Sequence, residues 1–171
     1  AMVGFNNGIT TTTHLFNAMS PFHHRETGLP GAVFLHNEAS ASIIADGIHV
    51  DYETLKVCKK LLQERLFLIT DAVEEVREGA YVHVKQADRF TLPDGTLSGS
   101  CLTMLQAVKN CVKHAAIPLD EALRMASTYP AQLINSVDTG KIKPGYKANL
   151  VVFTDDFRVS HTVVEGKIYD Y

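Results

Sequence analysis

Three short runs of strand-forming residues in this chain each end on a polar side chain that can take part in chemistry. The first run ends at His14, the second at His49, and the third, residues 66–70, ends at Asp71. The chain between successive runs is long enough for a helix, which is the rhythm of parallel strands joined by helical connections. Because α/β barrels build their sites where parallel strands end, the pattern predicts an α/β fold that groups these three residues.

The composition of the chain narrows the class of protein. Its 171 residues are 46% hydrophobic and 20% charged, with a net charge of −3, as expected for a soluble globular protein with one good core. The sequence has no basic excess for nucleic acid or an anionic membrane surface, and no apolar stretch long enough to span a bilayer. Cys58, Cys101 and Cys111 form no CxxC pair, so we expect reduced thiols, a cytoplasmic protein and no structural zinc site built from them.

Helical patterns follow the second and third runs. Asp51 is predicted to cap the first of these helices. The residues expected on its inward face are Leu55, Cys58, Leu61 and Leu62. Further helices are predicted over 103–115 and 118–127, with a short one that starts at Pro130. We expect no helix before the first strand, and a polar loop over 23–28.

Alternating residues indicate β structure in two other parts of the chain. Residues 80–96 are predicted to form a hairpin-like insertion with its turn at Asp94 and Gly95. Residues 140–171 are predicted to hold short strands of a small β domain, whereas 2–139 supplies about three strand–helix units. A closed barrel needs eight such units and roughly 250 residues. The chain is therefore either a small sheet protein or the back portion of a larger barrel.

The residues at the ends of the runs each have a functional and an ordinary interpretation. His14 could be a ligand of zinc, iron or nickel, or a hydrogen-bonded histidine at the start of a loop. His49 could polarise a substrate carbonyl or bind a sugar hydroxyl, or it could only order its own loop. Asp71 could be a general base in a partly dry pocket, or the N-cap of the segment that follows.

Polar residues in the loops extend the candidate set. Arg25 suits phosphate or carboxylate recognition through paired hydrogen bonds, although a surface ion pair with Glu26 is the ordinary alternative. Ser100 is predicted to cap the helix over 103–115. The histidines expected to be exposed to solvent are His23, His24, His36, His83, His114 and His161.

Four blocks of sequence, in this order, resemble a known family. They are THLFNAM at 13–19, IADGIHVD at 44–51, TDA at 70–72 and GTLSGS at 95–100. Together they resemble the N-acetylglucosamine-6-phosphate deacetylases of the amidohydrolase superfamily, and the resemblance covers essentially the whole chain. It implies the C-terminal part of a (β/α)8 TIM-type barrel, plus strands of a small β-sandwich made from both termini. It also implies hydrolysis of the acetamide of N-acetylglucosamine 6-phosphate to acetate and glucosamine 6-phosphate.

The resemblance also implies roles for particular residues. His14 matches a ligand of a divalent metal, zinc or iron, and Asp71 matches the acid/base that activates water and protonates the leaving amine. The residues matched to substrate contacts are Asn17, Ala18, Arg25, His49, Leu102, Thr103 and Met104. In that family the other metal ligands are a glutamate and a histidine, which come from strands that precede the segment containing His14. We therefore expect this chain to carry only part of the metal site and to be inactive on its own.

The implied partner is a small-molecule amino-sugar phosphate. An open half-barrel would also expose strand edges and apolar helix faces, which association into a homo-oligomer would cover. Two alternatives stay open at this point. One is a non-catalytic, oligomerising domain that binds a sugar phosphate, and the other is a different amidohydrolase, such as an N-acyl amino acid deacetylase.

Overall fold

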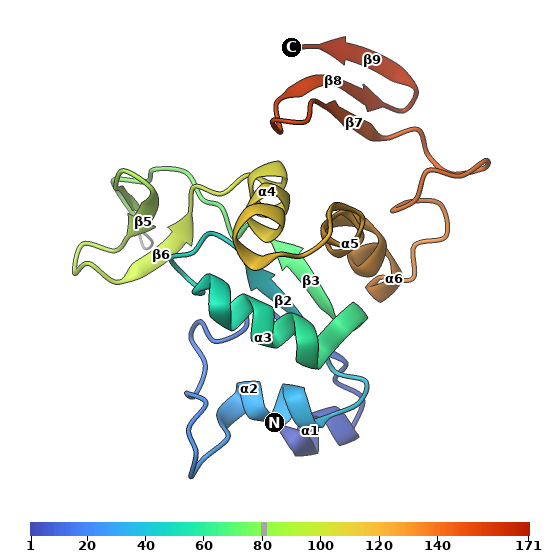
Figure 1. The fold of residues 1–171 in the computed structure, drawn as a ribbon. Coiled ribbons are helices and arrows are strands. Elements are labelled where there is room, and N and C mark those ends of the chain that lie inside the picture. The colour runs from blue at the N-terminus through green and yellow to red at the C-terminus, as the bar shows by residue number, and fades with distance from the viewer. Residues whose placement is uncertain (80–81) are drawn as a thin grey trace.

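A parallel sheet of three strands forms the centre of the computed structural model, which describes residues 1–79 and 82–171 (Figure 1). The strands are β1 (Thr11–Thr12), β2 (Ser40–Ile44) and β3 (Leu66–Ile69), in the order β1-β2-β3. The prediction of an α/β fold with parallel strands joined through helices is thus confirmed. The sheet is open, so its membership of a closed barrel stays a prediction.

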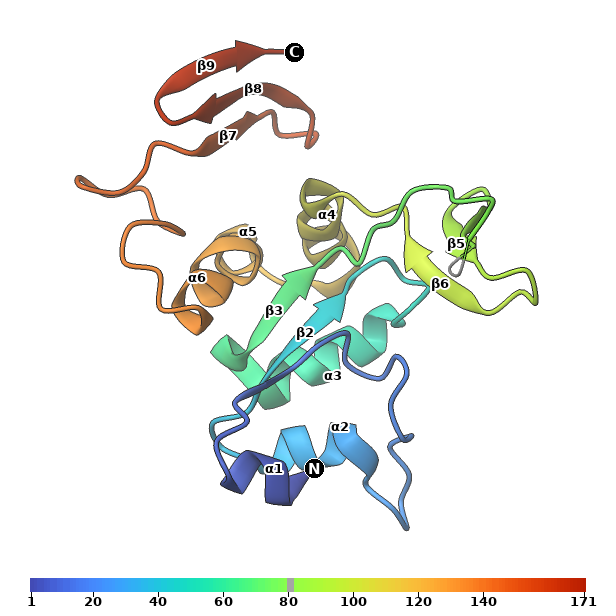
Figure 2. The ribbon, with the colours of Figure 1, turned by 180° about the vertical axis from the view of Figure 1, so that it is seen from behind.

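Strands β2 and β3 form where the chain is mostly apolar and buried, whereas β1 consists of two threonines, whose β-branched side chains favour a strand. Ile43, Ile44 and Leu66 are fully buried, as expected for parallel strands that are covered on both sides. Their register places Ile44 opposite Ile69, so β2 and β3 end at the same edge. Seen from behind, the arrows of β2 and β3 run side by side in the same direction (Figure 2).

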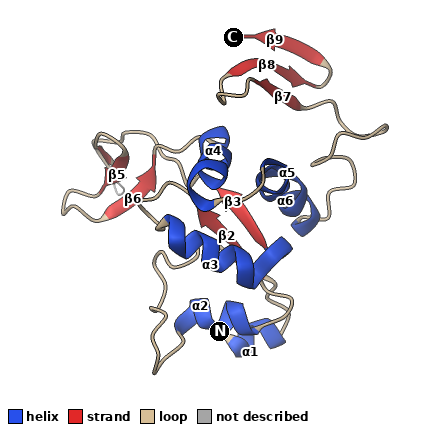
Figure 3. Cartoon of the chain, viewed as in Figure 1, coloured by secondary structure: helices blue, strands red, loops and turns tan. Residues whose placement is uncertain are grey.

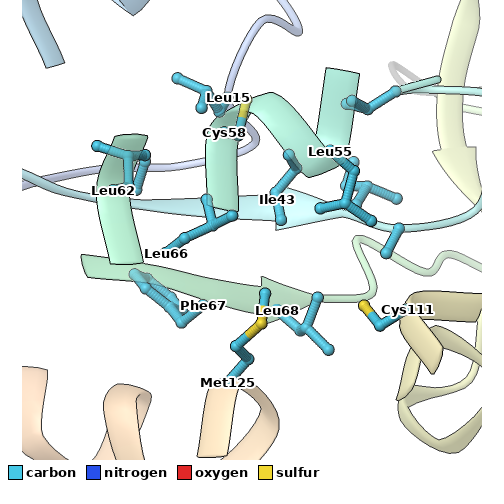
Figure 4. Packing of buried hydrophobic residues seen from close by; sticks show 14 of the residues in the cluster. Leu15, Ile43, Leu55, Cys58, Leu62, Leu66, Phe67, Leu68, Cys111 and Met125 are labelled. Carbon is cyan, nitrogen blue, oxygen red and sulfur yellow. The ribbon is translucent and has the colours of Figure 1, made fainter. Parts of the chain in front are cut away.

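Helix α3 (Tyr52–Leu62) provides much of the packing against this sheet. The side chain of Asp51 accepts hydrogen bonds from the backbone N–H groups of Glu53 and Thr54, which confirms the predicted N-cap. In Figure 4, Leu55 and Leu62 of α3 lie on one side of β2 and β3. The prediction for Leu61 is wrong, because its side chain is 50% exposed: with 3.6 residues per turn, Leu55, Cys58 and Leu62 share a stripe that excludes it.

Two helices near the start of the chain differ from the expectations. Helix α1 (Met2–Asn6) precedes the first strand, and helix α2 (Gly28–Leu35) begins at Gly28, the last residue of the loop expected over 23–28. Pro30 lies in the first turn of α2, where its missing N–H costs little. Most residues of α2 are apolar and several are buried, so the segment lacks the alternation of polar and apolar faces that makes a helix recognisable.

The helical region after α4 (Met104–Ala115) is continuous where two helices were predicted. Helix α5 (Leu119–Leu123) passes into a π-helical turn (Arg124–Thr128) and then into α6 (Tyr129–Leu133). Pro130 is the second residue of α6 and has no N–H to donate, and the π-helical turn directly before it is where the regular α-helical hydrogen bonding is interrupted. Met125 of the π-turn and Cys111 of α4 are fully buried, and Figure 4 shows both near β3.

Two antiparallel sheets complete the fold, as the strand colouring of Figure 3 makes clear. One contains β4 (Val84–Lys85), β5 (Arg89–Thr91) and β6 (Leu97–Ser100). Its turn lies at Asp94 and Gly95 as predicted, since the Asp94 carboxylate accepts the backbone N–H of Thr96 at 2.9 Å. The first two residues of the predicted insertion, 80 and 81, lie outside the described residues.

The other antiparallel sheet is formed by the end of the chain and lies apart from the parallel strands (Figure 1). Its strands are β7 (Leu150–Phe153), β8 (Val159–Val164) and β9 (Lys167–Asp170). Strands β8 and β9 are joined by a turn at Glu165 and Gly166, both with positive φ. Many of its apolar side chains are exposed. The division into domains at 139 and 140 stays a prediction.

Arg65 ties the start of β3 to the end of α2. Its guanidinium donates hydrogen bonds to the carbonyl oxygens of Val33, His36 and Ala39. We expect Arg65→Ala to lower the free energy of unfolding by about 1–3 kcal/mol, because buried carbonyls lose their donor. Urea unfolding measures this loss. The control Arg77→Ala removes an exposed arginine that is paired with Glu75, and a similar loss there would contradict the prediction.

Candidate active site

The three polar residues predicted at the strand ends follow one edge of the parallel sheet. His14 comes after β1, His49 after β2 and Asp71 after β3. The backbone N–H of Leu15 donates to the Ser42 carbonyl at 2.9 Å, so the chain stays beside β2 beyond the end of β1. The structure thus places the three residues in the loops at the carboxyl ends of neighbouring strands, where α/β enzymes hold their catalytic groups.

The His14 ring is held by its own loop. Its backbone N–H donates to the Ser42 hydroxyl at 2.9 Å, and its Nδ1 lies 2.9 Å from the Asn17 carbonyl oxygen. A carbonyl only accepts, so Nδ1 carries the proton and Nε2 keeps its lone pair. Histidines that bind metals are oriented in this way, with the second ring nitrogen donating to a carbonyl or carboxylate.

Several non-glycine residues at this edge have left-handed backbone conformations. The φ angles are 37° at His14, 75° at Phe16, 52° at Ala18 and 50° at Asp71. Residues other than glycine adopt such angles at a cost of about 1 kcal/mol or more, and they gather at functional sites. Three of the four belong to the predicted set, so the loops after β1 and β3 have the strained backbone typical of active sites.

His49 is paired with Asp46 within the loop after β2. The Nδ1 atom of His49 lies 2.6 Å from Asp46 Oδ2, and the two side chains are only 4% and 8% exposed. Asp46 Oδ1 accepts the backbone N–H groups of Ile48 and His49. Burial alone would raise the pKa of Asp46, but these hydrogen bonds outweigh it and lower that pKa. Asp46 is therefore a buried carboxylate that stays ionised and fixes the His49 ring.

Asp71 is exposed, and its backbone is joined to β6. The Ser100 N–H donates to the Asp71 carbonyl at 2.9 Å, and the Ser100 hydroxyl donates to the carbonyl of Thr70. The prediction that Ser100 caps α4 is wrong, because Thr103 is the N-cap and accepts the N–H of Gln106. The N-cap is the residue directly before the first helical residue, and Ser100, the last residue of β6, lies three residues before that position. Ser100 instead holds the backbone of Thr70 and Asp71 in place through these two hydrogen bonds.

The remaining candidates lie in the loops around these residues. Leu102 is buried, whereas Thr103 is exposed and Met104 is half-buried. Asn17 is half-buried and Ala18 is exposed in the turn after His14. Arg25 lies in the exposed loop before α2, and no ion pair between Arg25 and Glu26 is present in the described part of the chain.

Two of the histidines expected to be exposed are half-buried. The Nδ1 atom of His36 accepts the backbone N–H groups of Glu38 and Ala39, and Nδ1 of His83 lies 2.9 Å from the Ser98 hydroxyl. Both histidines hold local structure. The expectation fails for them because a turn or a neighbouring strand brings polar partners to the ring.

The described residues do not form a complete metal site. Within residues 1–79 and 82–171, no group of three histidine, cysteine, aspartate or glutamate side chains is arranged to hold a metal ion. His14 has the hydrogen-bonding pattern of a ligand, but a catalytic zinc site needs about three protein ligands. Cys58 and Cys111 are buried, and burial raises the pKa of each thiol to about 12, so neither suits metal binding at neutral pH.

A cavity of about 650 Å³ lies between the loop after β1, helix α2 and helix α3. Its lining is mostly apolar and includes Phe16, Met19, Phe22 and Phe34. Among the described residues, His49 is the only member of the predicted set that lines it. The described lining has neither lysine nor arginine, which makes this cavity a poor place for a sugar phosphate.

Comparison with known families decides the identity of the chain. Residues 1–169 match the amidohydrolase family. The chain belongs to the amidohydrolase family. Amidohydrolases with known names are similar along its whole length. The N-acetylglucosamine-6-phosphate deacetylase of Haemophilus influenzae is 37% identical over 98% of this chain and 46% of its own length. The enzyme of that name from Lysinibacillus sphaericus is 34% identical over 94% of this chain and 44% of its own length.

Solved structures of this family have the same fold as the chain. The N-acetylglucosamine-6-phosphate deacetylase of Pasteurella multocida matches with a TM-score of 0.93 and 36% identity, over 99% of this chain and 47% of that one. A variant of the Mycobacterium smegmatis enzyme, solved in complex with N-acetyl-D-glucosamine-6-phosphate, matches with a TM-score of 0.90 and 29% identity. The match covers 98% of this chain and 47% of that one. The chain thus spans about half the length of these relatives.

The feature that sequence reasoning missed is the pairing of Asp46 with His49. Asp46 stands in the block that carries the family resemblance, but its side chain had no predicted role. The signal was present, because an aspartate followed by glycine readily accepts backbone N–H groups two and three residues ahead. Such a turn brings the side chain at the third following position back to the carboxylate, as His49 is here.

Proposed function

We propose that this chain supplies the C-terminal part of the active site of an N-acetylglucosamine-6-phosphate deacetylase, which hydrolyses the acetamide of its substrate to acetate and glucosamine 6-phosphate. The observation that carries the proposal is the placement of His14, His49 and Asp71 in the loops after three neighbouring parallel strands. The named relatives, at 34–37% identity along the whole chain, support this substrate.

Asp71 is the acid/base in this proposal. It takes a proton from the attacking water and later delivers a proton to the amide nitrogen, which makes the amine able to leave. Its carboxylate is exposed at the loop after β3, so water and substrate have access to it. The hydrogen bonds from Ser100 to the carbonyls of Thr70 and Asp71 hold that loop in place.

His14 is the residue of this chain that would hold the divalent metal, zinc or iron, through Nε2. Such a metal, when bound, lowers the pKa of water and polarises the amide carbonyl. The other ligands would come from outside the described residues, and the other assigned residues of this chain bind substrate and move protons. We assign substrate contacts to His49, to Asn17 and Ala18 in the turn after β1, and to residues 102–104.

The proposal also covers the complete fold, the oligomeric state and the cellular location of the protein. The parallel strands would belong to a (β/α)8 barrel, and β7 to β9 would belong to a small β-sandwich. The exposed apolar side chains of that last sheet support association into a homo-oligomer. The three free thiols support a reducing, cytoplasmic location. No helix in the described parts of the chain has the length and apolar character needed to cross a membrane.

The proposal can be tested in a chimera, because the chain matches only part of its relatives. Residues 1–169 would replace the matching segment of the Haemophilus influenzae enzyme, and acetate release from N-acetylglucosamine 6-phosphate would be measured with zinc or iron present. We expect turnover in the chimera and none in the isolated chain. A folded chimera without turnover would contradict the proposal, and the unmodified Haemophilus enzyme serves as the control for the assay.

Arg25 is assigned to the phosphate of the substrate. Its exposed guanidinium is available for paired, charge-assisted hydrogen bonds. Arg25→Ala in the chimera is therefore expected to lower kcat/KM for the phosphorylated substrate by about tenfold or more. Turnover of N-acetylglucosamine without the phosphate should not change. The matched control is Arg158→Ala, which removes an exposed arginine paired with Asp156. Equal losses on both substrates would favour an amidohydrolase that does not recognise phosphate.

N-acetylgalactosamine 6-phosphate is a second candidate substrate. A protein of Escherichia coli K12 named putative N-acetylgalactosamine-6-phosphate deacetylase is 32% identical over 92% of this chain and 99% of its own length. The two sugars differ only in the orientation of one hydroxyl. Comparison of kcat/KM for both sugar phosphates in the chimera decides between them, and the higher identity to the glucosamine enzymes favours the first substrate.

A further inference from the structure

Asp46 accepts hydrogen bonds at both carboxylate oxygens and at its backbone carbonyl. Its Oδ1 accepts the backbone N–H groups of Ile48 at 2.9 Å and His49 at 2.8 Å, while Oδ2 lies 2.6 Å from His49 Nδ1. Its backbone carbonyl accepts the Tyr52 hydroxyl at 3.1 Å. Both carboxylate oxygens and the backbone carbonyl of Asp46 therefore accept hydrogen bonds from residues 48–52, the segment that contains His49.

The surroundings of this loop leave little freedom for the pair. Gly47 has a φ of 77°, and a Cβ there would lie 2.7 Å from the Tyr52 ring, so the loop packs tightly around the tyrosine. Just before the loop, the Ala45 carbonyl accepts a hydrogen bond from the buried Asn110 side chain at 2.8 Å. The end of β2 is thus anchored on α4, and the loop on α3.

The geometry points to Asp46 as a positioning residue that fixes the His49 ring through Nδ1–H and so leaves Nε2 to meet a substrate oxygen. This inference rests on the proposed function. The assignment follows from the donors available: an ionised carboxylate only accepts, so the proton in the 2.6 Å contact belongs to Nδ1. The Nε2 atom of His49 has no hydrogen-bond partner in the described part of the chain.

The substitution Asp46→Asn reverses this arrangement while keeping the shape of the side chain. The backbone N–H groups of Ile48 and His49 require an oxygen at the Oδ1 position, so the amide nitrogen of the asparagine has to face the ring. Nδ1 then accepts a hydrogen bond, and Nε2 carries the proton. The variant therefore loses the lone pair of Nε2 in the neutral ring, so that Nε2 meets a substrate oxygen only as an N–H donor and not as an acceptor.

The first experiment is nitrogen-15 NMR of the His49 ring in the isolated chain, without substrate. We expect Nδ1 to be protonated in the parent chain and unprotonated in Asp46→Asn. The control is Asp51→Asn, which makes the same chemical change at a neighbouring N-cap, where asparagine also serves well. The control should leave the His49 signals unchanged. An unprotonated Nδ1 in the parent chain would overturn the inference.

The second experiment measures kcat/KM for N-acetylglucosamine 6-phosphate in the chimera. We expect a loss of about ten- to a hundredfold in Asp46→Asn, as for other residues that orient an active-site histidine, and no loss in Asp51→Asn. Full activity in a folded Asp46→Asn chimera would overturn the positioning role. If no chimera has activity although the NMR signals are as expected, the proposed function fails, and the role of Asp46 in that reaction fails with it. If Asp46→Asn reverses the tautomer but keeps full activity, only the positioning role of Asp46 is contradicted, and the proposed function stands.

Discussion

Asp71→Asn is expected to reduce acetate release by the chimera at least about a hundredfold, the usual contribution of a positioned acid/base group. Asparagine neither accepts the proton of the attacking water nor delivers one to the amide nitrogen. The substitution is gentle for the fold, because asparagine tolerates the left-handed backbone found at this position, where φ is 50°. The loss should therefore appear in kcat with little change in stability, as measured by steady-state assays and circular dichroism.

The control for this variant is a neighbouring carboxylate that is also exposed. Glu74 is exposed and lies three residues after Asp71 in the same segment. Glu74→Gln removes the same charge and should retain the activity of the parent chimera. If Asp71→Asn keeps turnover within a few-fold of the parent, the acid/base lies elsewhere. A loss in Glu74→Gln as large as that in Asp71→Asn would indicate that activity depends on the total negative charge of the loop, and not on proton transfer by Asp71.

The features that could be predicted from the sequence are those decided by neighbouring residues. An apolar run followed by a polar residue marks the end of a buried strand, which is the pattern before Asp71, while the β-branched threonines before His14 favour a strand without being apolar. The N-cap at Asp51 and the turn at Asp94 are equally local, because each side chain bonds to N–H groups two or three residues ahead.

The features that could not be predicted depend on contacts across the fold. Ser100 bonds to the carbonyl of Thr70, thirty residues away, instead of capping the helix that follows it. Helix α2 is apolar without a clear period, so its conformation is set by packing. The metal site is a third case, since the described residues offer one histidine with suitable geometry and no complete ligand set.

Gly99 is the residue whose substitution should most disturb the contact between β6 and the segment that carries Asp71. A Cβ at Gly99 would lie 2.7 and 2.8 Å from the two methyl carbons of Val73 and 3.3 Å from the Asp71 carbonyl oxygen, and its φ is 151°. Gly99→Ala therefore combines overpacking with backbone strain. We expect a loss of about 2–4 kcal/mol in the free energy of unfolding of the chain, measured with urea.

Gly95→Ala separates these two contributions. Gly95 lies in the turn of the same sheet with a φ of 88°, but a Cβ added there would meet no atom within 4 Å. Strain alone should cost about 1 kcal/mol at this position. The excess loss in Gly99→Ala measures the steric contribution, and equal losses in the two variants would contradict it. The same collision pushes β6 away from Asp71 and weakens the hydrogen bond from Ser100 to its carbonyl. In the chimera, Gly99→Ala should therefore lower kcat/KM well below the Gly95→Ala value, since small displacements of an acid/base group reduce its efficiency steeply.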